Sequence, residues 1–91
     1  MPVPAVDLEK AVALAIRYGA RRLILFGSYQ TSPETARDVD LAVEGVAGWK
    51  LFELGAEIER ALRVPLDLVP LDEDTPLTQR IRRYGEVLYE R

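Results

Sequence analysis

LFGSYQTSPETARDVDL, residues 25–41, is the stretch of sequence that decides the fold. It begins in an apolar run that ends at Gly27 and finishes in a run where acidic and apolar residues alternate. A short apolar run before Gly-Ser is typical of a buried strand that ends in a turn, and strict alternation is typical of a strand with one buried face. The polar residues between them, with Pro33, predict a turn of helix followed by a loop. The stretch therefore predicts two linked strands.

Helical and extended patterns continue on both sides of this stretch. Apolar residues recur every three or four positions in the helical segments, and Asp7 and Thr75 stand where helix caps are expected. Prolines at both ends of the third extended segment favour the edge of a sheet. The predicted helices are 7–19, 49–62 and 75–84, and the predicted strands are 22–26, 38–44 and 64–71, with a short apolar tail at 87–89. The apolar face predicted for the first helix comprises Leu8, Val12, Ala15 and Ile16.

Size and composition limit the possible functions. A chain of 91 residues is expected to form a single domain, residues 1–91, and its 48% hydrophobic content suits a globular protein. The absence of cysteine and histidine excludes thiol nucleophiles, Ser-His-Asp triads and zinc fingers. A net charge of -3 argues against direct nucleic-acid binding. With no membrane-spanning stretch and no signal pattern at the N-terminus, a cytoplasmic location is expected.

The Gly27–Ser28 turn is the first candidate binding feature. A Gly-Ser pair between a strand and a helix offers backbone N–H groups and a hydroxyl, which together suit a phosphate group. The plain alternative is an ordinary turn, because such pairs end many strands. The Gly-Ser pair therefore needs support from other residues.

Asp38 and Asp40 provide that support. Side-chain alternation along a strand places both carboxylates on the same face, with Cα atoms about 6.5 to 7 Å apart. Like charges at that spacing repel one another and raise each other's pKa. A divalent cation would relieve the repulsion, and magnesium is usually held by one or two carboxylates together with substrate phosphates. The alternative is a solvated face of an edge strand.

Asp67 is a charged residue within an apolar strand. If the third strand lies beside the second, Asp67 can complete a cluster of three carboxylates, able to bind a metal or to accept a proton from an attacking hydroxyl. The alternative is an aspartate near a turn that accepts a hydrogen bond from a backbone N–H.

Two other groups of residues allow two interpretations each. A basic cluster on the last helix is interpreted as a solvated helix face in preference to a phosphate-binding or RNA-binding group. It consists of Arg80, Arg82 and Arg83. A set of aromatic residues is assigned to core packing in preference to a patch that binds a partner. It consists of Trp49, Phe52 and Tyr89.

LFGS, nine intervening residues, DVDL, a later aspartate on a strand and the closing GEVLYER occur in this order. Over nearly the whole chain the pattern resembles the minimal nucleotidyltransferases of the polymerase-beta-type superfamily. Members of this size are similar to the antitoxin halves of two-gene toxin–antitoxin modules whose partner is a HEPN-domain ribonuclease. The resemblance implies the nucleotidyltransferase fold, an α/β arrangement with a small mixed sheet of three to four strands flanked by about four helices.

The resemblance also implies roles for the candidate residues. Gly27 and Ser28 would hold the triphosphate of ATP, Asp38 and Asp40 would bind two magnesium ions, and Asp67 would help to bind one ion and activate the acceptor hydroxyl. The implied activity is transfer of AMP to a hydroxyl, that of a tyrosine, on the HEPN toxin. The partner would thereby be restrained within a hetero-oligomer.

Two other functions are compatible with the sequence. The loop that follows Ser28 differs from that of many relatives at or near Tyr29, Thr31 and Arg37, which favours a binding module that neutralises its partner by occlusion. A transferase acting on a small molecule is the third reading. Against it, 91 residues leave little chain for an acceptor-binding domain.

Overall fold

The two strands predicted around residues 25–41 form the centre of a four-stranded sheet in the computed structural model, which describes residues 6–91. The strands are β1 (Arg22–Phe26), β2 (Val39–Glu44), β3 (Leu66–Pro70) and β4 (Glu86–Glu90). The helices are α1 (Leu8–Arg17), α2 (Ser28–Thr31), α3 (Trp49–Leu62) and α4 (Pro76–Tyr84). The predicted α/β fold with a small mixed sheet is confirmed. The first part of the predicted domain, residues 1–5, lies outside the described residues.

The sheet has the strand order β3-β2-β1-β4. β1 is antiparallel to both of its neighbours, whereas β2 and β3 are parallel. The order places β3 at an edge, as its flanking prolines predict. The apolar tail at 87–89 belongs to β4 and forms the other edge.

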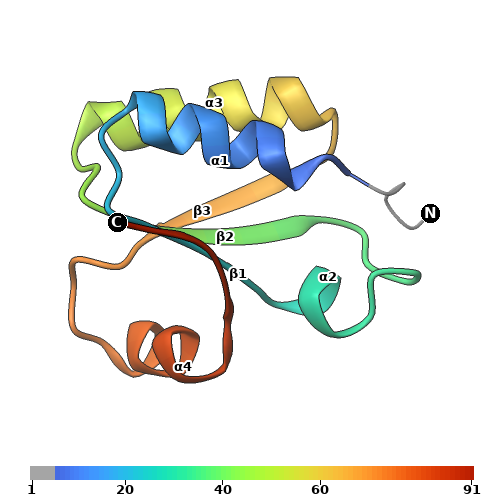
Figure 1. The fold of residues 1–91 in the computed structure, drawn as a ribbon. Coiled ribbons are helices and arrows are strands. Elements are labelled where there is room, and N and C mark those ends of the chain that lie inside the picture. The colour runs from blue at the N-terminus through green and yellow to red at the C-terminus, as the bar shows by residue number, and fades with distance from the viewer. Residues whose placement is uncertain (1–5) are drawn as a thin grey trace.

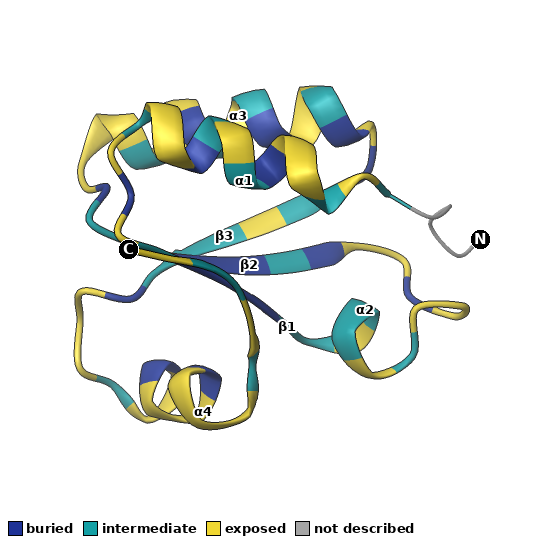
Figure 2. Ribbon diagram, viewed as in Figure 1, coloured by how far each residue is buried: buried dark blue, intermediate teal, exposed yellow. Residues whose placement is uncertain are grey.

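Helices cover the two faces of the sheet unequally (Figure 1). α1 and α3 lie side by side over one face, and α4 lies on the opposite side of the sheet. The short helix α2 directly follows the end of β1. The larger core lies under α1 and α3, where Val39, Leu41 and Val43 of β2 are fully buried (Figure 2). The smaller core under α4 consists of Ile24, Ala42, Leu71 and Ile81. Much of the second face is therefore free of helices.

Three large side chains lie elsewhere than their patterns predict. In α1 the buried residues are Ala11 and Ala15, and Ile16 is 48% exposed. The preference for core packing is wrong for Trp49 and Phe52, which are 68% and 81% exposed.

Helical geometry explains the exposure of these two aromatic residues. The buried stripe of α3 consists of Leu54, Ile58 and Leu62, at intervals of four residues. At about 100° per residue, positions 49 and 52 point well away from that stripe. Tyr89, by contrast, packs against the larger core, as its pattern predicts.

The ends of α1 and α4 follow the predicted caps. The Asp7 carboxylate accepts a hydrogen bond from the Glu9 backbone N–H, at 3.1 Å. Thr75 and Thr78 exchange hydrogen bonds between side chain and backbone, forming a capping box at the start of α4. Within residues 6–91, no helix is both long enough and apolar enough to cross a bilayer.

Candidate active site

A row of side chains crosses the open face of the sheet from β3 to β1. Asp67 pairs with Asp40 in the parallel β2–β3 register, and Asp40 pairs with Phe26 in the antiparallel β1–β2 register. Residues paired across neighbouring strands project from the same face. This face is opposite the one on which α1 and α3 pack, because Val39 and Leu41, the neighbours of Asp40 in sequence, are buried in the larger core. The third strand thus lies beside the second, which is the condition under which Asp67 can join the other carboxylates.

Gly27 lies against the carboxylate of Asp40. Its φ is +79°, in the region that favours glycine. A Cβ atom added at this position would lie 2.2 Å from Oδ2 of Asp40. Both the backbone conformation and the lack of a side chain are thus needed to bring the Gly27–Ser28 turn into contact with Asp40. Ser28 is exposed at the first position of α2.

The segment between Ser28 and Asp38 consists of one helical turn and a loop, as predicted. The Thr31 hydroxyl donates to the Gly27 carbonyl at 3.4 Å and helps to close the turn. The Tyr29 side chain packs against the larger core, and its hydroxyl accepts a hydrogen bond from the Val6 N–H at 3.2 Å. Tyr29 therefore has a structural role, whereas Arg37 is exposed.

The three carboxylates form an uncompensated negative site. Burial raises the pKa of Asp40, and the nearby Asp38 and Asp67 carboxylates raise that pKa further. Asp38 and Asp67 are themselves exposed. Among the ion pairs formed within residues 6–91, none involves any of the three. A cation or a proton is the natural means of relieving their repulsion.

The donor set matches magnesium in type. Carboxylate oxygens are the hard ligands that this ion prefers. Asp40 and Asp67 lie in register on neighbouring strands, and Asp38 lies just before β2. In the described part of the chain, no three acidic side chains are placed so that they alone could hold a metal ion. That arrangement suits an ion shared between one or two carboxylates and substrate phosphates.

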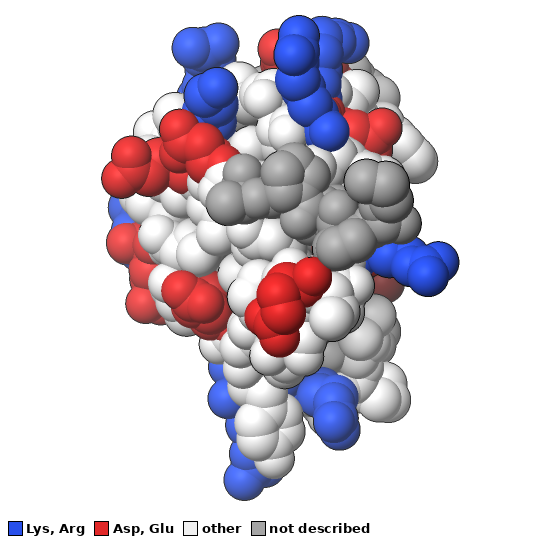
Figure 3. Space-filling view, turned by 90° about the vertical axis from the view of Figure 1, so that its right-hand side faces the viewer, with Lys and Arg blue, Asp and Glu red and all other residues white. Residues whose placement is uncertain are grey.

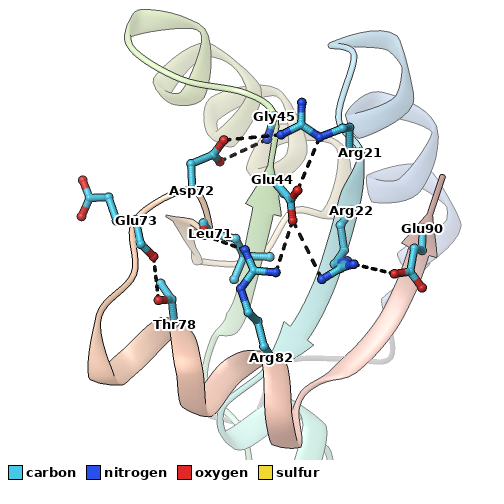
Figure 4. Close-up of polar contacts among 10 residues, drawn as sticks. All are labelled: Arg21, Arg22, Glu44, Gly45, Leu71, Asp72, Glu73, Thr78, Arg82 and Glu90. Atoms are coloured by element: carbon cyan, nitrogen blue, oxygen red, sulfur yellow. Dashed lines mark hydrogen bonds and ion pairs between the residues drawn. The ribbon is translucent and has the colours of Figure 1, made fainter.

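Glu44, at the far end of β2, fixes α4 below the sheet (Figure 4). Its carboxylate forms ion pairs with Arg21 at 3.4 Å, Arg22 at 3.9 Å and Arg82 at 3.3 Å. Burial alone would raise the pKa of Glu44, but the positive charges of these arginines lower it overall. Arg82 also donates to the Leu71 carbonyl at 2.9 Å. Sequence patterns missed this network because its members are far apart along the chain.

The basic cluster of α4 is thus divided between different contacts. Arg82 joins the Glu44 network, whereas the guanidinium carbons of Arg80 and Arg83 lie 5.6 and 5.8 Å from the centre of the Tyr84 ring. In Figure 3 acidic side chains lie at the left and below the centre of the face turned to the viewer, and basic side chains project at both its upper and lower ends.

The mixed sheet, the Gly-Ser turn and the aspartates of neighbouring strands are together typical of the nucleotidyltransferase class of enzymes. The comparison with family models makes the assignment definite. Residues 9–91 match the model described as polymerase beta, nucleotidyltransferase, and the chain belongs to this family. No curated protein matches the chain.

Similar solved structures are toxin–antitoxin complexes. A chain of a mutant MntA–HpeT toxin–antitoxin is 26% identical, with a TM-score of 0.82 over 96% of this chain and 75% of that one. A toxin–antitoxin with AMP-PNP is also 26% identical, with a TM-score of 0.81 over 94% and 75% of the two chains. The third is a tri-AMPylated Shewanella oneidensis HEPN toxin in complex with MNT antitoxin, at 28% identity and a TM-score of 0.69 over 91% of this chain and 69% of that one.

Proposed function

We propose that this chain is a magnesium-dependent nucleotidyltransferase that moves AMP from ATP to a hydroxyl group of a HEPN-domain toxin and acts as its antitoxin. The observation that carries the proposal is the contact of Gly27 with Asp40 and the pairing of Asp40 with Asp67. This arrangement brings a phosphate-binding turn and carboxylates together on one open face. Family membership supports the assignment of nucleotidyl transfer to that face.

Each candidate residue has a role in this proposal. Gly27 and Ser28 hold the triphosphate, and the missing side chain of Gly27 lets this turn approach the Asp40 carboxylate. Asp38 and Asp40 hold the magnesium ions, Asp67 contributes to one of them, and Asp67 also accepts the proton of the acceptor hydroxyl. When bound, the metal ions supply positive charge at the attacking and leaving oxygens.

The reaction is a substitution at the α-phosphorus of ATP. The acceptor oxygen forms a bond to this phosphorus, the bond between the α-phosphorus and the bridging oxygen to the β-phosphorus breaks, and pyrophosphate leaves. The proton of the hydroxyl passes to the Asp67 carboxylate. Positioning and charge stabilisation supply most of the rate enhancement in such chemistry, and we assign the positioning to the row on the open face.

The structural neighbours support the choice of partner and of nucleotide. One solved complex contains a tri-AMPylated HEPN toxin and an MNT antitoxin, and another contains AMP-PNP. We extend both features to this chain: its nucleotide is ATP, and it transfers AMP to a HEPN-domain partner. The tyrosine hydroxyl of that partner as acceptor is part of our proposal. The open face below β2 and β3 leaves room for an acceptor presented by a second protein.

Transfer of label from ATP tests the proposal. The chain is incubated with magnesium, ATP labelled in its α-phosphate and the HEPN protein encoded beside it. The wild type should label the partner, and Asp67→Asn should reduce the rate by about a hundredfold or more, because the hydroxyl loses its proton acceptor. Asp74→Asn, an exposed aspartate near the start of α4, is the matched control and should transfer at the wild-type rate. Failure of the wild type to label the partner contradicts the proposal.

Neutralisation by occlusion is a second candidate. The observation that favours it is the loop after Ser28, which differs from that of many relatives and in which Tyr29 packs against the larger core. It predicts that the chain inhibits the ribonuclease of its partner without ATP, and that Asp38→Asn with Asp40→Asn leaves this inhibition intact. Inhibition that requires ATP and these aspartates excludes it.

A further inference from the structure

A groove of about 360 Å³ lies along the edge of the sheet, between β3 and α3. Leu66, Asp67 and Leu68 line it from the strand, and Phe52 and Gly55 are among the residues that line it from the helix. Successive side chains of a strand point to opposite faces of a sheet. Because three consecutive residues of β3 line the groove, it follows the edge of this strand and connects the α3 side of the sheet with the open face.

One of the residues that line the groove is the proposed proton acceptor of the reaction. Asp67 is exposed, and it pairs with Asp40 in the register of β2 and β3. In the proposed function the acceptor hydroxyl gives its proton to Asp67. The residues that flank this hydroxyl in the acceptor protein must therefore lie beside the edge of β3, where the groove is.

The side chains of the groove are apolar and acidic. Phe52 is 81% exposed, although folding normally buries a side chain of this kind. The charged residues that line the groove are Glu59 and Asp67, both acidic. Such a lining suits the apolar and basic side chains of a protein. It disfavours a nucleic acid, because the carboxylates would repel the phosphates.

The backbone of β3 can pair with an extended segment of a second protein. The Val39 N–H of β2 donates to the Pro65 carbonyl at 3.0 Å. In a parallel ladder alternate residues bond to the same neighbouring strand, so the backbone groups of Leu66 and Leu68 point away from β2. The Glu59 carboxylate accepts a hydrogen bond from the Leu66 N–H at 3.1 Å. The groups of Leu68 are thus the ones that face an incoming strand.

Gly55 keeps the groove open between the helix and the strand. Glycine is among the least favourable residues inside a helix, and Gly55 lies in the middle of α3. Packing does not require it, because an added Cβ atom would meet Leu68 side-chain atoms at 3.6 and 3.7 Å, which are ordinary contact distances. The added atom would instead lie between two residues that line the groove. The need for an open groove therefore explains this glycine better than the packing of the helix does.

We propose that this groove docks the protein that receives AMP, with an apolar side chain of an extended segment against Phe52 and the acceptor hydroxyl beside Asp67. The inference rests on the proposed function, because it takes Asp67 as the proton acceptor. A second copy of the chain is the other possible occupant. The acidic lining and the net charge of -3 disfavour it, because two copies repel one another.

Binding and turnover of the partner test the proposal. The HEPN protein encoded beside the chain is titrated calorimetrically, without ATP, into the wild type, Phe52→Ala and Gly55→Leu. Each variant should bind about tenfold more weakly, the loss typical of removing or blocking a central interface residue. In the labelled-ATP assay each should raise the KM for the partner about tenfold and leave kcat unchanged, whereas Asp67→Asn should lower kcat.

Ile16→Ala is the matched control, because Ile16 is a large apolar residue of α1 that is 48% exposed and does not line the groove. It should bind the partner and transfer AMP as the wild type does. Gly55→Leu should resist urea at least as well as the wild type, because leucine favours a helix. Weaker binding by this variant would then not result from misfolding. Phe52→Ala is an independent test if Gly55→Leu fails to fold.

Three results overturn the inference. The first is wild-type affinity for the partner in a folded Phe52→Ala. The second is a lower kcat with an unchanged KM, which would give the groove a part in the chemistry and not in docking. The third is self-association of the wild type that Phe52→Ala abolishes without changing the affinity for the partner, because the groove would then join two copies of the chain.

The two assays also separate this inference from the proposed function. If the wild type transfers AMP and both variants do so with the same KM, only the docking inference fails. If the wild type binds the partner but transfers no AMP, the proposed function fails, and the titrations still decide whether the partner docks in the groove.

Discussion

Gly27 combines a backbone requirement with a contact requirement. The φ of Gly27 is +79° and that of Gly19 is +83°. Of these two glycines, Gly27 is the one at which an added Cβ atom would meet other atoms within 4 Å. The atom that it would meet belongs to the end of the Asp40 side chain, which can rotate away. Comparing alanine substitutions at these two positions therefore distinguishes the effect of backbone strain from the effect of displacing the Asp40 carboxylate.

We predict that Gly27→Ala and Gly19→Ala each lower the free energy of unfolding by about 1 to 2 kcal/mol, from strain at positive φ. Only Gly27→Ala should also abolish AMP transfer, because it displaces Asp40. Urea unfolding and the labelled-ATP assay measure the two effects. Normal transfer by a folded Gly27→Ala would contradict the role given to this contact.

The charge of Asp40 should weaken the folded state at neutral pH. Because the pKa of Asp40 is raised in the folded protein, its ionised form is less favourable there than in the unfolded chain. Asp40→Asn should therefore increase the free energy of unfolding at pH 7. The gain should shrink as the pH falls through the pKa of Asp40, because the wild-type carboxyl then takes up a proton.

Urea unfolding at a series of pH values measures this effect. Asp7→Asn is the control, because asparagine also caps a helix and Asp7 is exposed, so no gain at pH 7 is expected. A loss of stability in Asp40→Asn at pH 7 would show that the carboxylate has a compensating partner.

At the scale of residues, the sequence predicts that Asp38 and Asp40 share one face of a strand, whereas β2 begins at Val39 and Asp38 lies just before it. The spacing of Asp38 and Asp40 predicts a shared face only where both residues lie within the strand. The contact of Gly27 with Asp40 is not visible in the sequence, because the two residues are separated by the whole helical turn and loop.

At the scale of elements, the Glu44 network connects β1, β2 and α4. The folded protein lowers the pKa of Glu44, so its ion pairs stabilise the protein above the ordinary pKa of a glutamate and are lost as the pH falls through the lowered pKa. We predict that Glu44→Gln lowers the free energy of unfolding at pH 7 by about 1 kcal/mol, as expected for a partly exposed network.

The difference between Glu44→Gln and the wild type should disappear at acid pH, where the wild-type carboxyl is also neutral. Urea unfolding at both pH values checks this. Glu73→Gln, whose carboxylate takes no part in this network, is the matched control. If the difference in unfolding free energy between Glu44→Gln and the wild type is the same at both pH values, the effect comes from packing and not from the charge of Glu44.

The two faces of α3 should respond differently to truncation. Leu54 is fully buried, and Phe52 is 81% exposed. We predict that Leu54→Ala costs about 2 to 5 kcal/mol of stability, whereas Phe52→Ala changes it by less than about 0.5 kcal/mol. Thermal or urea unfolding measures both. A large loss in Phe52→Ala would restore the core role that its sequence pattern suggested.

Element boundaries were largely predictable, because periodicity and caps are local signals. β1 and α3 begin and end where the patterns placed them. The orientation of the helices was harder to predict, since α1 and α3 have apolar residues on more than one side, and Ile16, Trp49 and Phe52 are exposed. The apolar tail could not be assigned to β4, because its partner strand is more than 60 residues away.

At the scale of the whole molecule, strand order creates the candidate site. Asp67 is separated from Asp40 by α3, and only the parallel pairing of β2 with β3 brings the two into register. From the sequence, Asp67 is expected near Asp40 only if the two strands pair, and no local pattern predicts that pairing. The same order leaves the face that carries these residues open beside α4, where a nucleotide and a partner could both approach (Figure 1).

The central claim is that this open face transfers AMP to a protein partner, and intact-mass spectrometry of that partner tests it most directly. After incubation with the wild-type chain, ATP and magnesium, the partner should gain the mass of one or more adenylyl groups. With Asp38→Asn and Asp40→Asn combined, it should gain none, and with Asp74→Asn it should gain the same mass as with the wild type. An unmodified partner in the wild-type reaction, or equal modification by the double variant, would contradict the account.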